Sequence, residues 1–435
     1  MLRSKGPALF LLLVLAAAAA PGARDDEDAR QKALELQKKA IACHERKDWQ
    51  CFLESSRQAE ALLPGNLRLV YNLACAESLT GDFAGAAKHL DLVLDRQLDL
   101  GIEGDQDLAP LRAAPEYAPV ARRLAALQAP VSKSTVAFRL PQKDLLTEGI
   151  AFDPGTRAFF ISSVHRRKIV RRNPDGTVVD FVSEGRDGLE AVLALRADPK
   201  RKLLWACSAA LPEMAGYEKT MDGSSSLFAF DLATGRLVRR VALPKEGKRA
   251  LNDLAIAENG DVYATDSLGG GLYRLKALGD SLEAVVPPSA LRSPQGVGFV
   301  PGARDRRAFV AEYGTGIWSV DLATGEKALV ASPPDVPLQG VDGLIVHADE
   351  LVVTQNGIRP IRVARLKLDA SSSKVVRAEI LEKNSPLLDE PTLGVLVGDD
   401  FYYIANPQWG SFEKGGKAFP LEKLQEPTIL KVTLR

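Results

Sequence analysis

The chain has 435 residues, of which 46% are hydrophobic and 26% are charged, so it has the composition of a folded protein and a length that suits two domains or one large closed architecture. Lys plus Arg and Asp plus Glu both number 56, and the formal net charge is therefore zero. A balanced charge produces no long-range field toward nucleic acid or an anionic membrane surface, so neither is an expected partner.

The first residues have the pattern of a secretory signal peptide. Arg3 and Lys5 give a basic start, an unbroken apolar run extends from Ala8 to Ala20, and small residues suited to cleavage follow. That run is shorter than the roughly 20 apolar residues that span a bilayer, and no later stretch is apolar enough to do so. We therefore expect residues 1–23 to be a signal peptide, and the mature protein to be exported to the periplasm or the extracellular space without a membrane span.

Residues 24–130 are predicted to form a small helical segment. Apolar residues recur there at intervals of three and four, which is the periodicity of an amphipathic helix. Turn residues at 46–48, 64–66 and 80–82 divide the pattern into four helices of roughly 12 to 15 residues each, paired as two hairpins. Residues 105–127 are expected to add a further helical turn and a linker.

The second hairpin, NLACAESLTGDFAGAAKHLDLVL, resembles a tetratricopeptide repeat, with Ala74 and Ala86 where the helices press together and Gly81 at the turn. The resemblance covers only about two repeats, and fewer than three repeats bury little surface by themselves. The segment is therefore interpreted in one of two ways: as a binding site for a protein partner, or as a module that covers one side of the larger domain.

Four cysteines in an exported chain permit disulfides without requiring them. Cys43 and Cys51 flank the first predicted turn between helices, and they suit both a disulfide across that turn and two small core residues of adjacent helices. Cys75 and Cys207 lie inside apolar patterns, which indicates packing.

From residue 131 onward the helical periodicity is replaced by short β-branched and aromatic runs, separated by Asp-Pro, Asp-Gly, Asn-Gly and Thr-Gly turns. Six segments share one outline, in which a polar residue with a Gly or small neighbour leads into an apolar strand. These six leading residues, called the leaders below, are Glu148, Glu190, Asn252, Gln295, Asp342 and Thr392.

The spacing of the leaders predicts a β-propeller. Successive leaders lie 42, 62, 43, 47 and 50 residues apart, which is the length of a four-stranded blade. The longest interval contains a polar, glycine-bearing insertion at residues 209–226 that is expected to form a long loop. We therefore predict a mainly β fold, with a six-bladed β-propeller over residues 131–435 preceded by the small α-helical segment. The strand 135–139 is expected to close the ring beside residues 429–434, which removes free sheet edges.

Four of the leaders predict a metal site. The first strand of each blade lines the central channel of a propeller, so the leaders are expected to meet at one mouth of that channel. Two carboxylates and two amide oxygens form an all-oxygen set that suits a hard cation, and Ca²⁺ fits better than Mg²⁺ because it accepts neutral ligands and flexible geometry. Another divalent cation is the alternative. The predicted ligands are Glu148, Asn252, Gln295 and Asp342. Glu190 suits a fifth ligand or a base, and Asp253 suits a residue that orients a ligand.

A second interpretation of the leaders is purely structural. Polar groups at the mouth of a propeller channel commonly bind backbone groups and ordered water, and a bound calcium ion can simply hold the blades together.

These motifs resemble those of a known family, the senescence marker protein, gluconolactonase and paraoxonase-like group of six-bladed propellers. TEGIAFDP, with Glu148, is similar to the first-blade metal motif of that family. Asn252 in LND, Gln295 in PQG and Asp342 in VDG stand where the family has Asn, Asn and Asp. The resemblance spans about residues 135–435, and Gln295 departs from it because this amide is longer than that of Asn.

The resemblance implies a calcium-dependent hydrolase that acts on a small-molecule cyclic ester, such as a sugar lactone. In such a reaction calcium polarises the lactone carbonyl while a carboxylate or an imidazole activates water. By the same resemblance, Asp342 is expected to be both a metal ligand and the catalytic base.

Residues in the loop after the second strand of each blade are expected to surround the same mouth. His165 is the only His among them and is a second candidate for the catalytic base, although a loop His is more often simply solvated. Arg359 and Arg166 suit binding of an acidic substrate and equally suit solvated surface positions. The residues predicted to bind substrate are Arg359, Asn356, Tyr313 and Trp409, and the others expected at the mouth are Ser163, Asp266, Glu312, Gln355 and Asn406.

Two other functions are compatible with the same fold. The first is a non-catalytic exported propeller that binds a peptide, a glycan or an envelope partner. The second is a quinone-linked redox propeller, which is disfavoured because the chain has no CxxCH haem motif and lacks the tryptophan-rich blade pattern of quinoprotein dehydrogenases.

Overall fold

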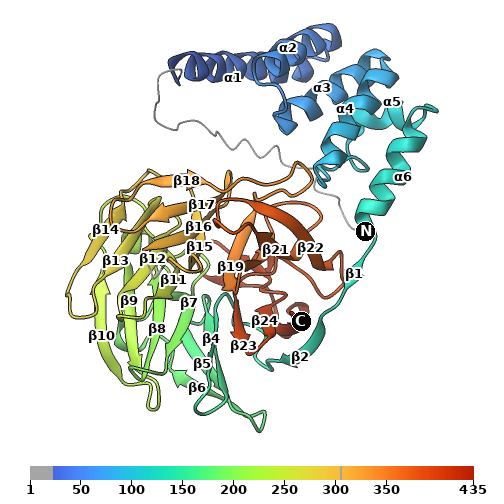
Figure 1. The fold of residues 1–435 in the computed structure, drawn as a ribbon. Coiled ribbons are helices and arrows are strands. Elements are labelled where there is room, and N and C mark those ends of the chain that lie inside the picture. Colours follow the sequence, from blue (N-terminus) through green and yellow to red (C-terminus); the bar gives the residue numbers. More distant parts are fainter. Residues whose placement is uncertain (1–22, 304–305) are drawn as a thin grey trace. The chain divides into compact units, whose positions relative to one another are not determined.

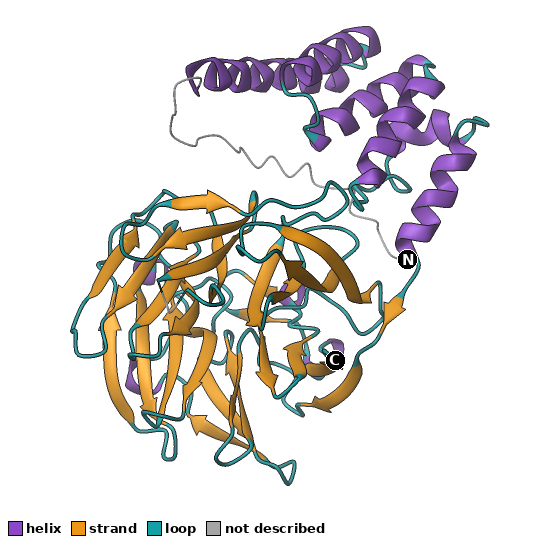
Figure 2. Ribbon diagram, viewed as in Figure 1, coloured by secondary structure: helices purple, strands orange, loops and turns teal. Residues whose placement is uncertain are grey.

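The computed structural model describes residues 23–303 and 306–435. The predicted signal peptide lies outside the described residues, except for its last residue. The described chain divides into two compact units, of which the first contains residues 23–95 and 99–124 and the second contains residues 96–98 and 125–435. The first unit is helical and the second is built from β-sheets (Figure 2). No helix in the described part of the chain is long and apolar enough to cross a membrane.

The helical unit begins with two hairpins, as the apolar periodicity predicts (Figure 1). Its first four helices are α1 (Ala23–Glu45), α2 (Trp49–Leu62), α3 (Leu67–Thr80) and α4 (Phe83–Asp95). Helix α1 has 23 residues and is longer than predicted. The helix extends to the N-terminal side of the apolar repeat because Ala29, Arg30 and Gln31 are strong helix formers.

The predicted turns contain the residues that end and begin these helices. The Asp48 side chain accepts a hydrogen bond from Cys51 N and caps α2, and Asn66 caps α3 by accepting from the backbone N–H groups of Arg68 and Leu69. Gly81 ends α3 with a φ of 87°, a conformation that favours glycine. Cys43 and Cys51 form a disulfide between the end of α1 and the start of α2.

Residues 105–127 contain more helix than predicted. After the single turns η1 (Gln106–Leu108) and α5 (Ala109–Arg112), the chain forms α6 (Tyr117–Gln128), a helix of 12 residues. Val120, Leu124 and Leu127 are buried and recur at helical spacing, so burial of one face stabilises this helix.

An ion pair connects the two helices of the second hairpin in the helical unit. His89 Nδ1 of α4 lies 2.7 Å from Oε2 of Glu77 in α3, whose side chain is only 4% exposed. The hydrogen bond with Glu77 raises the pKa of His89 above its usual value, although burial opposes this effect. Protonated His89 therefore stabilises the folded unit.

This pair predicts a pH dependence of the stability of the helices. Because the pKa of His89 is raised in the folded state, its contribution is complete below the pKa of an unfolded His and is lost as the pH rises through the higher folded-state value. His89→Gln should therefore lower the melting temperature at pH 5.5 more than at pH 8.5, measured on the full chain by circular dichroism at 222 nm. An equal loss at both pH values would contradict the charged pair.

The second unit is a six-bladed β-propeller (Figure 1). Blades 1 to 5 are each built on four consecutive antiparallel strands, and blade 6 combines three strands near the end of the chain with β2 from the start of the unit. Blades 1 to 3 consist of β3 (Ile150–Asp153), β4 (Ala158–Ser163), β5 (Lys168–Arg172) and β6 (Val178–Val182); β7 (Ala191–Asp198), β8 (Leu203–Ala209), β9 (Ser225–Asp231) and β10 (Leu237–Ala242); and β11 (Leu251–Ile256), β12 (Val262–Asp266), β13 (Gly271–Leu275) and β14 (Leu282–Val286).

The remaining blades complete the ring. Blades 4 to 6 consist of β15 (Pro294–Phe299), β16 (Arg307–Glu312), β17 (Gly316–Asp321) and β18 (Lys327–Leu329); β19 (Val341–His347), β20 (Glu350–Gln355), β21 (Arg362–Leu368) and β22 (Val375–Lys383); and β23 (Gly394–Val397), β24 (Asp400–Ile404), β27 (Thr428–Thr433) and β2 (Thr135–Arg139). The first strands of the blades contact one another in order, from β3 through β7, β11, β15 and β19 to β23 and back to β3. These contacts form the centre of the ring.

The predicted closure of the ring is confirmed. Strand β2 pairs antiparallel with β27, with Thr135 opposite Lys431 and Arg139 opposite Thr428. A second pairing was not predicted, in which β1 (Val131–Ser132) adds a fifth strand to blade 5 beside β22. Both pairings cover strand edges that would otherwise be open to another chain.

Glycines next to the leaders allow the blades to meet at the centre. A Cβ atom on Gly296 would lie 2.6 Å from Leu344 N of the next blade, and one on Gly343 would lie 2.7 Å from Thr392 O. Real Cβ atoms do not approach backbone so closely, and the inner strands could not pack with a larger residue at either position. The recurring pair of a polar leader and a glycine therefore has a physical cause.

Candidate functional site

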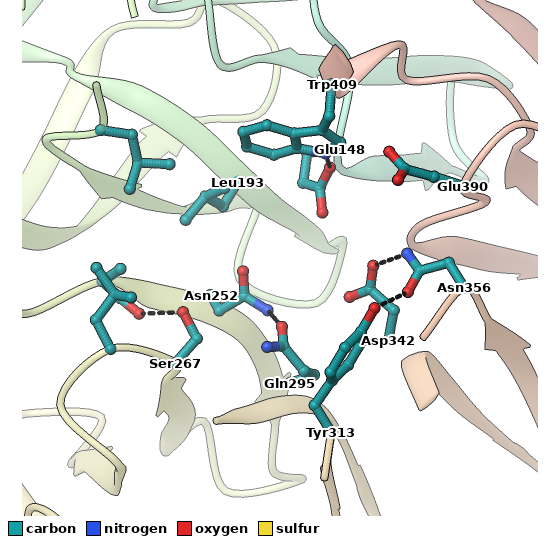
Figure 3. Close-up of a pocket in the computed structure, with 13 residues that line it drawn as sticks. Glu148, Leu193, Asn252, Ser267, Gln295, Tyr313, Asp342, Asn356, Glu390 and Trp409 are labelled. Atoms are coloured by element: carbon teal, nitrogen blue, oxygen red, sulfur yellow. Dashed lines mark hydrogen bonds between the residues drawn. The ribbon is translucent and has the colours of Figure 1, made fainter. Parts of the chain in front are cut away.

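A cavity of about 350 Å³ lies where the inner strands of the blades begin (Figure 3). This size suits a small organic molecule, since ligand pockets have volumes of roughly 300–1,000 Å³. Four of the six leaders line the cavity, namely Glu148, Asn252, Gln295 and Asp342. The other residues in its wall are Leu193, Leu211, Ala250, Ser267, Leu268, Tyr313, Asn356, Glu390 and Trp409.

The two amide leaders form a hydrogen-bonded pair. Asn252 Nδ2 donates to Gln295 Oε1 at 2.6 Å, and Gln295 Nε2 donates to Ser293 Oγ at 2.8 Å. Because its nitrogen is engaged by Gln295, Asn252 turns its oxygen into the cavity (Figure 3). Gln295, the residue that departs from the family pattern, therefore orients Asn252 and keeps its own oxygen occupied.

The two carboxylate leaders are held by residues of the loops around the mouth. Trp409 Nε1 donates to Glu148 Oε2 at 3.0 Å, and Asn356 Nδ2 donates to Asp342 Oδ2 at 2.6 Å. Tyr313 in turn donates its hydroxyl hydrogen to Asn356 Oδ1 at 2.8 Å, which fixes the orientation of that amide. Figure 3 shows the remaining oxygens of Glu148 and Asp342 turned toward the space that Asn252 also faces.

Burial disfavours the ionised form of both carboxylate side chains when no cation is bound. It raises the pKa of Glu148 well above its usual value, and the charge of Asp342 adds to this effect. Burial likewise raises the pKa of Asp342 to about 7, with further contributions from Asp253 and Glu390 and an opposing one from the hydrogen bond of Asn356. The site therefore concentrates negative charge that a bound cation would offset.

Glu390 supplies a third carboxylate that was not predicted. It is exposed at the mouth, lines the cavity and stands two residues before the leader Thr392. A signal was present in the segment DEPT, where only Pro391 separates this acidic side chain from the polar start of the last blade. Among the residues that the structure describes, no Arg, Lys or His lines this cavity.

The donor set fits the predicted calcium ion. Three carboxylates and the oxygen of Asn252 are hard oxygen ligands within one cavity, and none of the carboxylates there is neutralised by a cationic side chain of the described lining. Calcium coordination normally uses 6 to 8 oxygens, so roughly half of a shell would come from this chain and the rest from water or substrate.

Two leaders lie outside the lining. Glu190 Oε2 accepts a hydrogen bond from Ser224 Oγ at 2.9 Å, beside the insertion of blade 2. Thr392 is fully buried and donates to the backbone oxygen of Glu148 at 3.0 Å, which joins blade 6 to blade 1.

The structure places His165 away from the cavity lining. Its side chain is buried, and its Nδ1 lies 2.9 Å from Glu213 O while its ring contacts Phe412, with centroids 4.9 Å apart. Ala215 N also donates to His165 O at 2.9 Å. His165 thus anchors the insertion at 209–226 and is not part of the cavity lining.

The predicted substrate-binding residues divide into two groups. Asn356, Tyr313 and Trp409 line the cavity, whereas Arg359 is exposed and lies outside the lining. Arg166 is also outside it and is paired with Asp144. Neither arginine supplies the cationic contact that an acidic substrate would need.

Other polar residues expected at the mouth stabilise loops instead. Asp266, for example, accepts hydrogen bonds from Ala250 N and Gly269 N, both at 2.8 Å. Residues that make comparable loop contacts outside this cavity are Ser163, Glu312, Gln355 and Asn406.

Asp253, beside the leader Asn252, is fully buried beneath the site and does not line the cavity. Arg196 of blade 2 lies 3.0 Å from its carboxylate, and the backbone N–H groups of Leu254 and Val297 donate to it at 2.8 and 3.2 Å. Burial raises the pKa of Asp253, and Arg196 opposes that shift. This residue joins blades 2, 3 and 4 near the axis.

No protein-family model and no curated protein matches the chain. Similar solved structures include a gluconolactonase from Xanthomonas campestris, which is 18% identical, covers 72% of this chain and 93% of its own, and has a TM-score of 0.48. A calcium-binding protein, regucalcin, from Agrobacterium tumefaciens is 14% identical over 69% of this chain and 93% of its own, with a TM-score of 0.48. Virginiamycin B lyase from Staphylococcus aureus is 14% identical over 68% of this chain and 98% of its own, with a TM-score of 0.43.

Proposed function

We propose that the chain is an exported, calcium-dependent hydrolase that opens a cyclic ester. The observation that carries the proposal is the convergence of oxygens from Glu148, Asn252 and Asp342 in one cavity whose described lining contains no cation. These residues come from three different blades, and they are three of the four positions in the metal motif that the sequence resembles.

Calcium would be held by Glu148, Asn252 and Asp342, and Glu390, which lines the same cavity, would contribute through water. When bound, the ion supplies polarisation of the ester carbonyl and stabilisation of the charge that develops on its oxygen. Gln295 and Asn356 position the ligands. Gln295 accepts a hydrogen bond from Asn252, and Asn356 donates one to Asp342, both at 2.6 Å.

Asp342 is the group best placed to take a proton from the attacking water. Its Oδ2 is engaged by Asn356, which leaves Oδ1 facing the cavity, and the hydrogen bond from Tyr313 holds that amide in place. The fixed orientation lets one carboxylate oxygen act as a base without reorganisation of the side chain.

Calcium titration and a lactone screen test this function. We expect the chelator-treated, folded protein to bind about one calcium ion per chain at the cavity by isothermal titration calorimetry. Hydrolysis of lactones, followed with a pH indicator, should be lost with chelator and restored by calcium.

The two measurements separate the parts of the proposal. Glu148→Gln should weaken calcium binding. Glu350→Gln, which changes a carboxylate outside the cavity, should leave calcium binding unchanged. Calcium binding without turnover of any lactone or aryl ester would show an ion that only holds the blades together, and the hydrolase would then be rejected.

A further inference from the structure

A second cavity of about 340 Å³ lies in the propeller beside the start of β27, in blade 6. This volume is within the roughly 300–1,000 Å³ of small-molecule sites. Asp389 lines the second cavity and the next residue, Glu390, lines the central one, so the two cavities adjoin at this segment. They have no lining residue in common, and the proposed ester hydrolysis uses no residue of the second cavity.

Strand pairing and loop contacts bring four separate segments of the chain to this cavity. Arg139 at the end of β2 lies opposite Thr428 in the antiparallel pair of β2 and β27. Asp389 N donates to Ala405 O at 2.8 Å, which holds the loop before β23 against the end of β24. The lining is therefore assembled by the fold of blade 6 from residues up to 289 positions apart.

One wall of the cavity is fixed by two buried amides. Asn406 Oδ1 accepts a hydrogen bond from Thr428 N at 2.6 Å, and Asn406 Nδ2 donates to Glu426 O at 3.2 Å. Gln408 Oε1 accepts from Gln425 N at 2.6 Å, and Gln408 Nε2 donates to Gln425 O at 2.8 Å. These contacts hold residues 425–428 in one conformation, so a ligand would meet a preorganised wall.

The cavity carries charges of both signs that do not pair with each other. Its two cationic and two anionic side chains are Arg139, Lys143, Asp389 and Glu426. Among the residues that the structure describes, none of these four side chains forms an ion pair or a side-chain hydrogen bond. By contrast Asp144, the residue after Lys143, pairs with Arg166. The charged groups of the cavity therefore remain available to a ligand.

A ligand with both charges suits this lining better than a ligand with one. The guanidinium of Arg139 can donate two parallel hydrogen bonds to a carboxylate, and Asp389 can accept from an ammonium group. A ligand that has only a carboxylate would face the repulsion of Asp389 and Glu426, and a simple amine would face that of the two cations. Leu387 and Pro386 add carbon surface to the same lining.

We propose that the second cavity is a binding site for a zwitterionic amino compound of the α-amino acid class. The carboxylate of the ligand lies at the two cations, its ammonium group at the two carboxylates, and an apolar side chain beside Leu387. Such binding requires neither calcium nor ester hydrolysis, so it is independent of the proposed function.

Three compounds with nearly the same carbon skeleton test the site by isothermal titration calorimetry on the full chain at neutral pH. L-Leucine has both charged groups, isocaproate lacks the ammonium group, and isoamylamine lacks the carboxylate. We expect leucine to bind at least about tenfold more tightly than either of the others, because each of them loses one set of charge-assisted hydrogen bonds.

Variants locate the binding. Arg139→Met and Asp389→Asn should each weaken leucine binding by about tenfold or more. Both side chains are exposed and form no contact with other side chains that the fold would lose. Arg236→Met and Asp335→Asn are the matched controls, because they change exposed charges outside the cavity, and they should leave the affinity for leucine unchanged.

Three results would overturn the assignment. Absence of leucine binding would remove the site, and isocaproate or isoamylamine that binds as tightly as leucine would remove the requirement for both charges. The third concerns the place of binding. Glu148→Gln alters only the central cavity and should leave leucine binding intact, so a loss equal to that in Arg139→Met would place leucine in the central cavity instead.

Discussion

Asp342→Asn should reduce kcat/KM for lactone hydrolysis by about 10²- to 10⁴-fold, which is the usual contribution of a positioned general base. The substitution preserves the size of the side chain and removes the charge. Asp342 is only 7% exposed and one of its oxygens is held by Asn356, so its other oxygen is fixed in the cavity, where the base must act. Calcium affinity should fall as well, since the variant loses a charged ligand.

Two matched variants make this result specific. Asp349→Asn changes an exposed aspartate of the same blade that pairs with Lys367, and it should leave both turnover and calcium binding unchanged. His165→Gln should alter turnover far less than Asp342→Asn, because the imidazole contacts Glu213 O and Phe412 rather than the cavity. A larger loss in His165→Gln than in Asp342→Asn would identify His165 as the base.

Arg196→Met should destabilise the propeller by about 3–5 kcal/mol, the usual cost of leaving a buried charge without its partner. Asp253 is completely buried, and Arg196 is the cationic group 3.0 Å from its carboxylate. The free energy of unfolding, measured by urea denaturation of the full chain at pH 8, should report this loss. The deficit should shrink at lower pH, because burial raises the pKa of Asp253 and its protonated form needs no partner.

A surface pair and a double variant provide the controls for Arg196. Arg274→Met removes one of the two cations that pair with Glu283, the other being Lys276, and should cost less than about 1 kcal/mol. Combining Arg196→Met with Asp253→Asn should recover part of the lost stability, since the uncompensated charge is gone. Equal effects of Arg196→Met and Arg274→Met would show that the central pair contributes no more than an exposed one.

Much of the architecture is visible in short stretches of sequence. The caps Asp48 and Asn66 stand at the predicted turns, and pairs of a polar leader and a glycine, such as Asp342 with Gly343, recur in blades 1, 4 and 5, where the inner strands crowd. Helix α1 and strand β1 deviate from the prediction. Helix α1 is longer because good helix formers precede its apolar repeat, and β1 forms because it pairs with β22, which is far away in the sequence. Apolar periodicity detects neither cause.

The candidate site was predicted less completely. The four leaders expected to meet do line one cavity, but Glu390 and the leucines Leu193, Leu211 and Leu268 in its lining were not anticipated. Leu211 belongs to an insertion whose path depends on Pro212 accepting hydrogen bonds from Gly415 and Gly416, about two hundred residues away in the chain. His165 was expected at the mouth because of its position after a strand, and the same insertion covers it.

The sequence by itself determined that the chain contains helices followed by a six-bladed ring, and which residues begin the blades. Periodicity, turn chemistry and repeat length depend on the order of residues along the chain, so they can be recognised from the sequence alone. Only the tertiary structure decided which polar atoms face the cavity. The oxygen of Asn252 points inward because Gln295, 43 residues later, engages its nitrogen, and such an orientation depends on contacts between blades that no local pattern encodes.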